Sequence, residues 1–185
     1  MTIEAAIGGL DGSLGALAEA LDNLRWAAVQ AQPAVGDGHA LFDHYGAVAD
    51  DLCALLAEAR LPLAVARLPA ARGDPAAVGR ALLACQARCN RLAARFYGDA
   101  VAHEWREALD RLRRRGGEWA TWVEGVVDAL DRCSPPLYEV GEAQVAAWRA
   151  IVEWSPPVAV SVTANTIRIG ARCEATDRVS DGGGQ

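Results

Sequence analysis

The sequence DAVAHEWREALDRLRRRGGEWATWVEGVVDALDRC, residues 99–133, decides the fold of this chain because it carries two interleaved apolar rows. Two rows of residues spaced by seven run through it; one is Trp105, Leu112, Trp119, Val126 and Cys133, and the other is Leu109, Gly116, Val123 and Leu130. Residues at i, i+4, i+7 and i+11 share one face of a helix, so the rows form a single stripe. The pattern predicts one long central helix of roughly 35 residues, about 50 Å in length.

The glycine pair Gly116-Gly117 allows a second interpretation of this stretch. It follows a basic run at residues 111–115, and late arginines followed by glycine are typical of a helix end. Two helices that meet at a turn would keep a common register by chance roughly one time in three or four, given the helical period. We therefore prefer the unbroken helix, in which Gly116 lets another helix approach the backbone closely.

Two amphipathic helices are predicted in the first 75 residues, with apolar residues spaced by three and four. The first runs from residue 14 to 30; the glycine-rich dozen before it is expected to fray or to form a separate turn, and Asp11 or Ser13 is the expected cap. The second starts near His39 and gives way, in the proline-rich segment 60–75, to a short apolar turn of helix or a loop.

Two more helices flank the central one. Asp74-Pro75 is a typical helix start, a capping side chain followed by proline, and the third helix runs from there to residues 97–99. Ser134-Pro135-Pro136 is expected to separate the central helix from a fifth, which ends at the prolines after Ser155.

The apolar period changes from about 3.6 to 2 after residue 157. Small or polar residues alternate with Val158, Val160 and Val162, which is typical of a strand. The alternation continues at the odd-numbered positions Ile167 and Ile169, so a turn or bulge is expected at residues 164–166. The predicted fold class is all-α: an antiparallel bundle of four to five helices with one long central helix, plus a short C-terminal β arm or hairpin. The domain boundaries are 1–155 for the bundle, 156–170 for the arm and 171–185 for a disordered tail.

Composition excludes several classes of function. The 185 residues carry a net charge of −6, which argues against a nucleic-acid binder and against a partner on an anionic membrane surface. No apolar run reaches the roughly 18–20 residues of a membrane span, and the N-terminus lacks the basic start of a signal peptide. We expect a cytoplasmic protein, with a composition typical of a bacterium with a GC-rich genome.

No catalytic residue, cofactor or metal site is predicted from the motifs. Cys85 and Cys89 fall on an apolar stripe, and we interpret them, like the other cysteines, as reduced core thiols. The histidines His39, His44 and His103 lie at helix starts without a Glu-x-x-His or His-Glu-x-x-His pattern and are expected to be solvated. No serine sits in Gly-x-Ser-x-Gly, no glycine pair matches a phosphate loop, and the arginines of residues 111–115 are expected to form ion pairs.

The sequence favours a non-enzymatic interaction or adaptor module. A short strand or hairpin is marginal in water alone, so an arm on a helical bundle is expected to pair with the sheet of another protein or of a second copy. Trp122 and Trp154 lie at stripe edges, where tryptophan often anchors a partner. The predicted partner-binding residues are Val158, Val160, Val162, Ile167, Ile169, Trp122 and Trp154. The alternative is a helical-bundle sensor or enzyme with an internal ligand or metal pocket.

Overall fold

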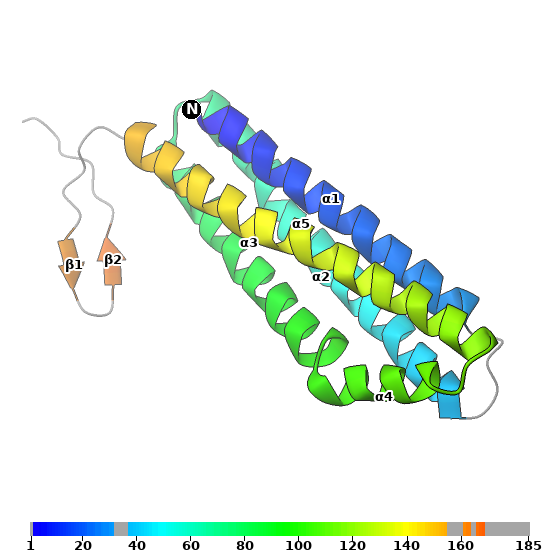
Figure 1. The fold of residues 1–185 in the computed structure, drawn as a ribbon. Coiled ribbons are helices and arrows are strands. Elements are labelled where there is room, and N and C mark those ends of the chain that lie inside the picture. Colours follow the sequence, from blue (N-terminus) through cyan, green and yellow to red (C-terminus); the bar gives the residue numbers. More distant parts are fainter. Residues whose placement is uncertain (1, 32–36, 155–160, 164–165, 169–185) are drawn as a thin grey trace, which may run out of the picture. The chain divides into compact units, whose positions relative to one another are not determined.

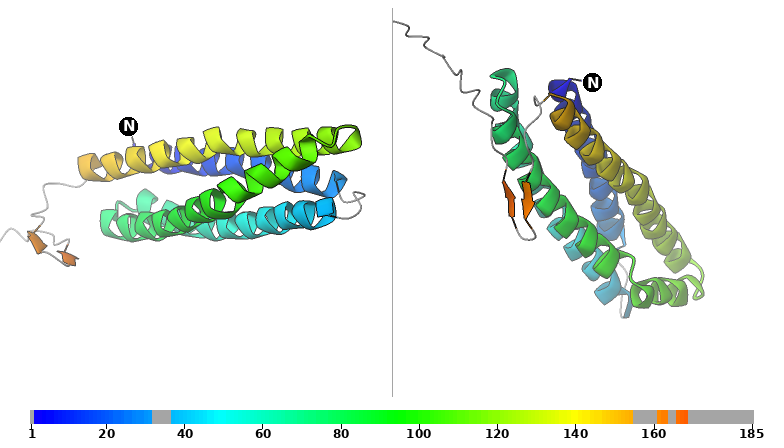
Figure 2. Two further views of the ribbon diagram at one scale, coloured as in Figure 1. Left: turned by 60° about the horizontal axis from the view of Figure 1, so that its bottom comes forward. Right: turned by 90° about the vertical axis from the view of Figure 1, so that its left-hand side faces the viewer.

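The computed structural model describes residues 2–31, 37–154, 161–163 and 166–168. The described helices are α1 (Ile3–Gln30), α2 (Asp37–Ala71), α3 (Pro75–Arg95), the π-helix η1 (Phe96–Ala100), α4 (His103–Arg113) and α5 (Glu118–Trp154). The four long helices form an antiparallel bundle in which α1 and α3 each pack on α2 and α5 (Figure 1). The short helix α4 lies across one end of the bundle and packs on α5 and α2 (Figure 2). The prediction of an all-α fold is confirmed.

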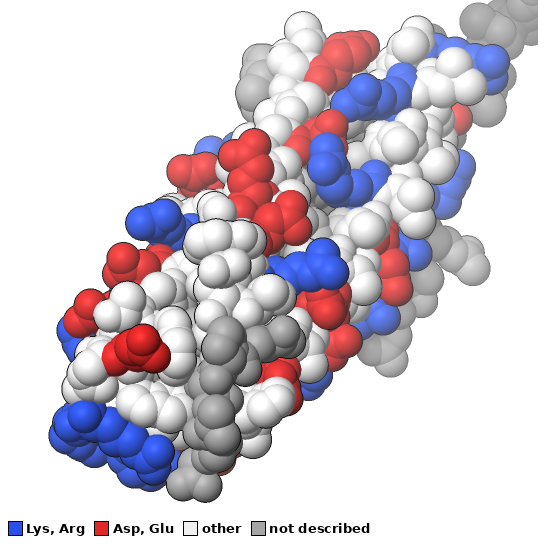
Figure 3. All heavy atoms as spheres, turned by 90° about the vertical axis from the view of Figure 1, so that its right-hand side faces the viewer, with Lys and Arg blue, Asp and Glu red and all other residues white. Residues whose placement is uncertain are grey.

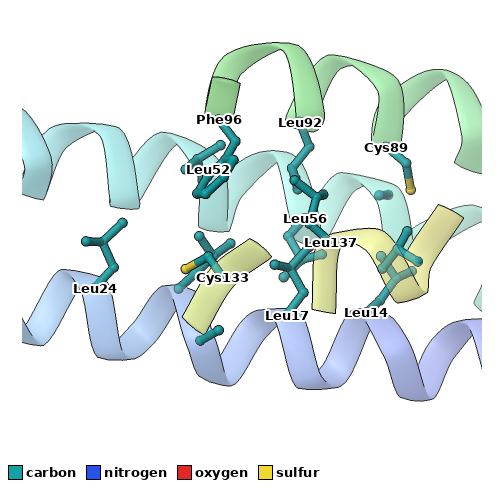
Figure 4. Close-up of a cluster of buried hydrophobic side chains, with 14 of the residues drawn as sticks. Leu14, Leu17, Leu24, Leu52, Leu56, Cys89, Leu92, Phe96, Cys133 and Leu137 are labelled. Carbon is teal, nitrogen blue, oxygen red and sulfur yellow. The ribbon is translucent and has the colours of Figure 1, made fainter. Parts of the chain in front are cut away.

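One apolar core runs through the bundle. In Figure 4, leucines and other apolar side chains from α1, α2, α3 and α5 point toward a common centre, among them Leu17, Leu56, Leu92 and Leu137. No polar or charged residue is buried among those that the structure describes. The buried residues of α1 and α5 include several alanines among the larger side chains: Ala6, Ala20, Ala28, Ala129, Ala147 and Ala150. Such small side chains allow two helix backbones to approach closely.

The long central helix is not where the apolar rows predicted it. The chain leaves the α-helix after Arg113 and re-enters it at Glu118, and Gly116 and Gly117 have φ values of 74° and 61° between the two helices. The second interpretation of the glycine pair is therefore the correct one. The stripe kept its register because α4 and α5 both turn their apolar faces toward the same core.

We expect Gly116→Ala to destabilise the protein, although for a different reason from close packing. A Cβ atom at Gly116 would meet nothing within 4 Å, so the idea that another helix approaches there is wrong. The positive φ is left-handed, which costs a non-glycine residue about 1–2 kcal/mol. Gly141→Ala is the matched control, since Gly141 lies within α5 with open space around it and should gain about 0.5–1 kcal/mol. Urea unfolding of both variants measures the difference, and a stabilised Gly116→Ala protein would contradict the assignment.

Two helix ends predicted at prolines are also wrong, whereas α5 ends at Trp154, just before the predicted end at Pro156-Pro157. α2 continues through Pro62 and Pro69, and α5 continues through Pro135 and Pro136, which joins the second half of the predicted central helix to the predicted fifth helix. A proline inside a helix costs about 3 kcal/mol because it removes a backbone donor. Apolar residues that follow these prolines are buried nonetheless: Leu63, Ala66, Ala70, Leu137 and Val140. Tertiary burial of an apolar face supplies most of the stability of a helix in a protein, and here it outweighs the lost bonds.

The start of α1 differs from the prediction as well. The helix is continuous from Ile3, and its cap is Thr2, whose Oγ1 accepts a hydrogen bond of 3.2 Å from the Ala5 N–H. Asp11 is not a cap; its carboxylate forms ion pairs with Arg60 and Arg67 of α2. Ile3 and the apolar residues that follow it are buried, so the glycines do not prevent the helix from forming.

The third helix is confirmed in detail. The Asp74 side chain accepts a hydrogen bond of 2.9 Å from the Ala77 N–H, and Pro75 occupies the first helical position. The predicted apolar stripe is buried throughout: Val78, Leu82, Cys85, Cys89, Leu92 and Phe96. At residues 97–99, where a simple end was expected, the chain instead widens into η1 before α4 begins.

Beyond Trp154 the chain forms a unit separate from the bundle. The structure describes two short strands in it, β1 (Ser161–Thr163) and β2 (Thr166–Arg168), paired antiparallel with Val162 opposite Ile167. The rest of the predicted arm, and the predicted tail, lie outside the described residues. A β arm over residues 156–170 therefore stays a prediction.

Charged side chains of both signs cover the surface of the bundle. Figure 3 views the end that carries α4; acidic and basic side chains lie mostly next to one another there, and one basic group gathers at the lower left margin. Ion pairs connect neighbouring helices, for example Arg25 with Asp50 and Arg91 with Glu58. No helix in the described part of the chain is both long enough and apolar enough to cross a membrane.

Candidate functional site

Two tryptophans frame a hollow of about 410 Å³ between α1 and α5. Trp26 projects from α1 with 65% of its surface exposed, and Trp122 lies half-buried on α5. Ala27 and Gly125 also line the hollow, which they leave open because their side chains are small or absent. Asp128 and Arg132, one helical turn apart on α5, supply its charges. We call this hollow the α1/α5 groove.

The sequence places Trp26 outside the core. Leu24 and Ala28 are buried on the apolar stripe of α1, and a residue two positions from each lies on another side of the helix. Sequence reasoning assigned Trp26 no role beyond the end of the first helix. Its position off the stripe was the available signal, since a large aromatic residue on a polar face has no core to fill.

Trp122, in contrast, is fixed by neighbouring rings. Its indole meets Phe42 edge-on at 6.5 Å between ring centroids and meets Trp119 edge-on at 5.5 Å. Trp119 in turn covers Gly38 so closely that a Cβ atom there would overlap the indole ring. The groove therefore combines one immobilised tryptophan with one exposed tryptophan, an arrangement suited to burial against another surface.

Trp154, the other predicted partner-binding tryptophan, does not line this groove. Trp154 ends α5, half-buried, beside a hollow of about 270 Å³ that Thr2 and Ile3 also line. It lies 32 residues from Trp122 along one helix, a distance of about 48 Å, so the two tryptophans cannot form one site. Val162 and Ile167 are opposite each other in the strand pair. Val158, Val160 and Ile169 lie outside the described residues.

The described cysteines are core residues, as predicted, with one exception. Cys85, Cys89 and Cys133 are buried, whereas Cys53 is half-exposed. The Sγ atoms of Cys85 and Cys89 are 3.9 Å apart; donation from Cys85 lowers the pKa of Cys89 and, together with burial, raises the pKa of Cys85. Burial raises the pKa of Cys133 to about 12, so this thiol is protonated near neutral pH.

The histidines divide into two groups. His39 and His103 are exposed and pair with Asp43 and Glu107, one turn further along their own helices, which agrees with the expectation of solvated residues. His44 is different: it is half-buried, and its ring stacks on Trp105 with 3.6 Å between centroids and 16° between planes. The expectation of a solvated His44 is wrong, because α4 folds back over the start of α2.

The described side chains do not form a group of three or more histidine, cysteine, aspartate or glutamate residues that could hold a metal ion. Comparisons with protein-family models, with curated proteins and with solved structures found no match to this chain. A hypothesis about function therefore rests on the surface chemistry described above.

Proposed function

We propose that the chain is a non-enzymatic protein-interaction module, and that its partner covers the α1/α5 groove. The observation that carries the proposal is the exposed Trp26 beside the fixed Trp122. Tryptophan is enriched among the residues that dominate binding energy at interfaces, because it buries a large apolar area at little cost in side-chain entropy. Val29, one turn beyond Trp26 on α1 and 47% exposed, extends the apolar surface.

A second copy of the chain is the partner we favour. Asp128 and Arg132 are adjacent on α5, so a two-fold axis between two grooves would place the aspartate of each copy near the arginine of the other. The same symmetry would bring the two Trp26 side chains into neighbouring hollows. Self-complementary charge of this kind favours an isologous dimer over a chance contact.

The C-terminal segment is proposed as a second contact. The alternation of Val158, Val160 and Val162 supports an extended strand, and so does the register that sets Val162 opposite Ile167. Such a strand can add to the edge of another sheet through backbone hydrogen bonds. In this proposal the arm strengthens an assembly that the groove makes specific.

A photo-crosslinking amino acid at position 26 tests the groove. It should yield a covalent dimer of the purified protein at micromolar concentration, whereas the same amino acid at position 138 should not, because Tyr138 is equally exposed on α5 but does not line the groove. Trp26→Ala should reduce dimerisation at least tenfold in sedimentation velocity, with Tyr138→Ala as the matched control. If position 26 instead cross-links to a different protein in cell lysate, the proposal of an interaction module stands, and that protein is the partner in place of a second copy.

The arm is tested by Val160→Asp combined with Ile167→Asp. We expect weaker assembly and unchanged helical circular dichroism, since the charges would block strand addition without touching the helices. A fall in melting temperature with no change in assembly would end the proposal for the arm. The proposal for the groove would be wrong if positions 26 and 138 cross-linked equally. It would also be wrong if neither position cross-linked, with purified protein or in lysate.

A further inference from the structure

A second hollow, of about 360 Å³, lies between the first turn of α2 and the helix α4. Its apolar lining consists of Ala40, Leu41, Trp105, Ala108 and Leu112, and its polar lining of Arg111 and Arg115. None of the described residues that line it is acidic. The volume falls in the range of pockets for small molecules, about 300–1,000 Å³.

The apolar lining of this hollow is held in place by contacts with residues that do not line it. The Trp105 indole stacks on His44, and His44 Nε2 lies 3.0 Å from the carbonyl oxygen of Asp99, to which it donates. Asp99 belongs to η1, and a π-helix leaves backbone carbonyls outside the regular α-helical pattern. Leu41 and Leu112 are buried. The lining is thus formed before any ligand arrives, which lowers the entropic cost of binding.

Two arginines line the hollow. Arg111 lies in the last turn of α4, and Arg115 lies in the turn that follows the helix. The guanidinium of Arg115 lies 5.7 Å from the centroid of the Trp119 ring, a cation–π contact. Arg111 is exposed and forms no ion pair or hydrogen bond within the described part of the chain, although its neighbour Arg113 pairs with Glu124 at 3.2 Å.

We propose that this hollow binds a small carboxylate with an apolar body, such as an aryl- or alkyl-carboxylic acid. The guanidinium of Arg111 can donate two parallel hydrogen bonds to the carboxylate. The apolar body then lies against Trp105, Leu41 and Leu112. The site does not depend on the α1/α5 groove, and its failure would leave the proposed assembly unaffected.

The test is a titration of the full chain with 3-phenylpropanoate, monitored through the NMR signal of the Trp105 indole N–H. The Trp105→Phe variant, which lacks this signal, assigns it. We expect a dissociation constant on the order of 0.1–1 mM for a ligand of this size. Arg111→Gln should weaken binding about tenfold or more, the loss expected for a charge-assisted hydrogen bond. Arg114→Gln is the matched control and should bind as the unaltered chain does, because Arg114 belongs to the same basic run but does not line the hollow. Circular dichroism of each variant checks that α4 is retained.

Two further probes separate this ligand class from its competitors. The neutral 3-phenylpropanamide should bind at least tenfold more weakly, since it offers no charge to Arg111. Inorganic phosphate should leave the Trp105 signal unchanged, since it has no apolar body. The proposal would be overturned if the amide bound as tightly as the carboxylate, or if phosphate gave an equal response. It would also be overturned if no probe gave a response up to 10 mM, or if Arg111→Gln and Arg114→Gln lost the same affinity.

Discussion

Replacing Phe96 by alanine is expected to lower the free energy of unfolding by about 3–5 kcal/mol, the usual cost of removing a buried phenylalanine. Phe96 is 1% exposed and opens η1, at the point where the chain leaves α3 for α4. Its ring points into the core (Figure 4). The alanine variant would therefore leave a cavity at the junction that positions α4, and the melting temperature should fall by about 6–20 °C.

Tyr97→Ala is the control for this prediction. Tyr97 is the next residue along the chain and 56% exposed, and its ring meets Phe96 edge-on at 5.4 Å. Its removal should cost about 0.5–1.5 kcal/mol, the value of an aromatic pair. Guanidinium unfolding followed by circular dichroism gives both values. Equal losses in the two variants would mean that Phe96 is not a core residue.

Replacing four glycines of α1 by alanine should have a large effect of the opposite sign. Gly8, Gly9, Gly12 and Gly15 all lie within the helix, and a Cβ atom at each would meet nothing within 4 Å. Each glycine costs the helix about 0.5–1 kcal/mol relative to alanine, so the fourfold variant should gain about 2–4 kcal/mol. The expected rise in melting temperature is about 4–16 °C.

This gain should be measured on dilute protein, where self-association does not contribute. The single variant Gly8→Ala should show about a quarter of the effect, because the four positions have open space and no shared contacts. A loss of stability in the fourfold variant would show that the N-terminal half of α1 is not helical in solution. A gain at low concentration combined with weaker assembly would show that the partner needs the bare backbone on this face.

Local chemistry made α3 predictable from the sequence. The Asp74-Pro75 start and the stripe that includes Leu82 and Leu92 depend only on residues within one helix. The boundaries at prolines were not predictable in the same way, because the cost of Pro62 or Pro135 is local while the burial that offsets it comes from other helices.

The prediction of where the central helix ends was wrong for a related reason. An apolar row records which residues face a core, but two helices separated by a turn can face the same core, as α4 and α5 do. The sequence alone could not decide whether Gly116 had a left-handed φ. The α1/α5 groove was missed because its members, Trp26 and Trp122, are 96 residues apart and meet only after α5 packs on α1.

The pairing of α1 with α5 also constrains how this chain can be synthesised. The ring of four helices closes between the first helix and the last, so α1 has only α2 as a neighbour until α5 has been made. Between the end of α1 at Gln30 and the end of α5 at Trp154 the ribosome must add 124 residues (154 − 30). At ordinary rates of translation that takes roughly 6–25 s. During this interval the part of the apolar face of α1 that α5 will cover remains open to chaperones and to other nascent chains.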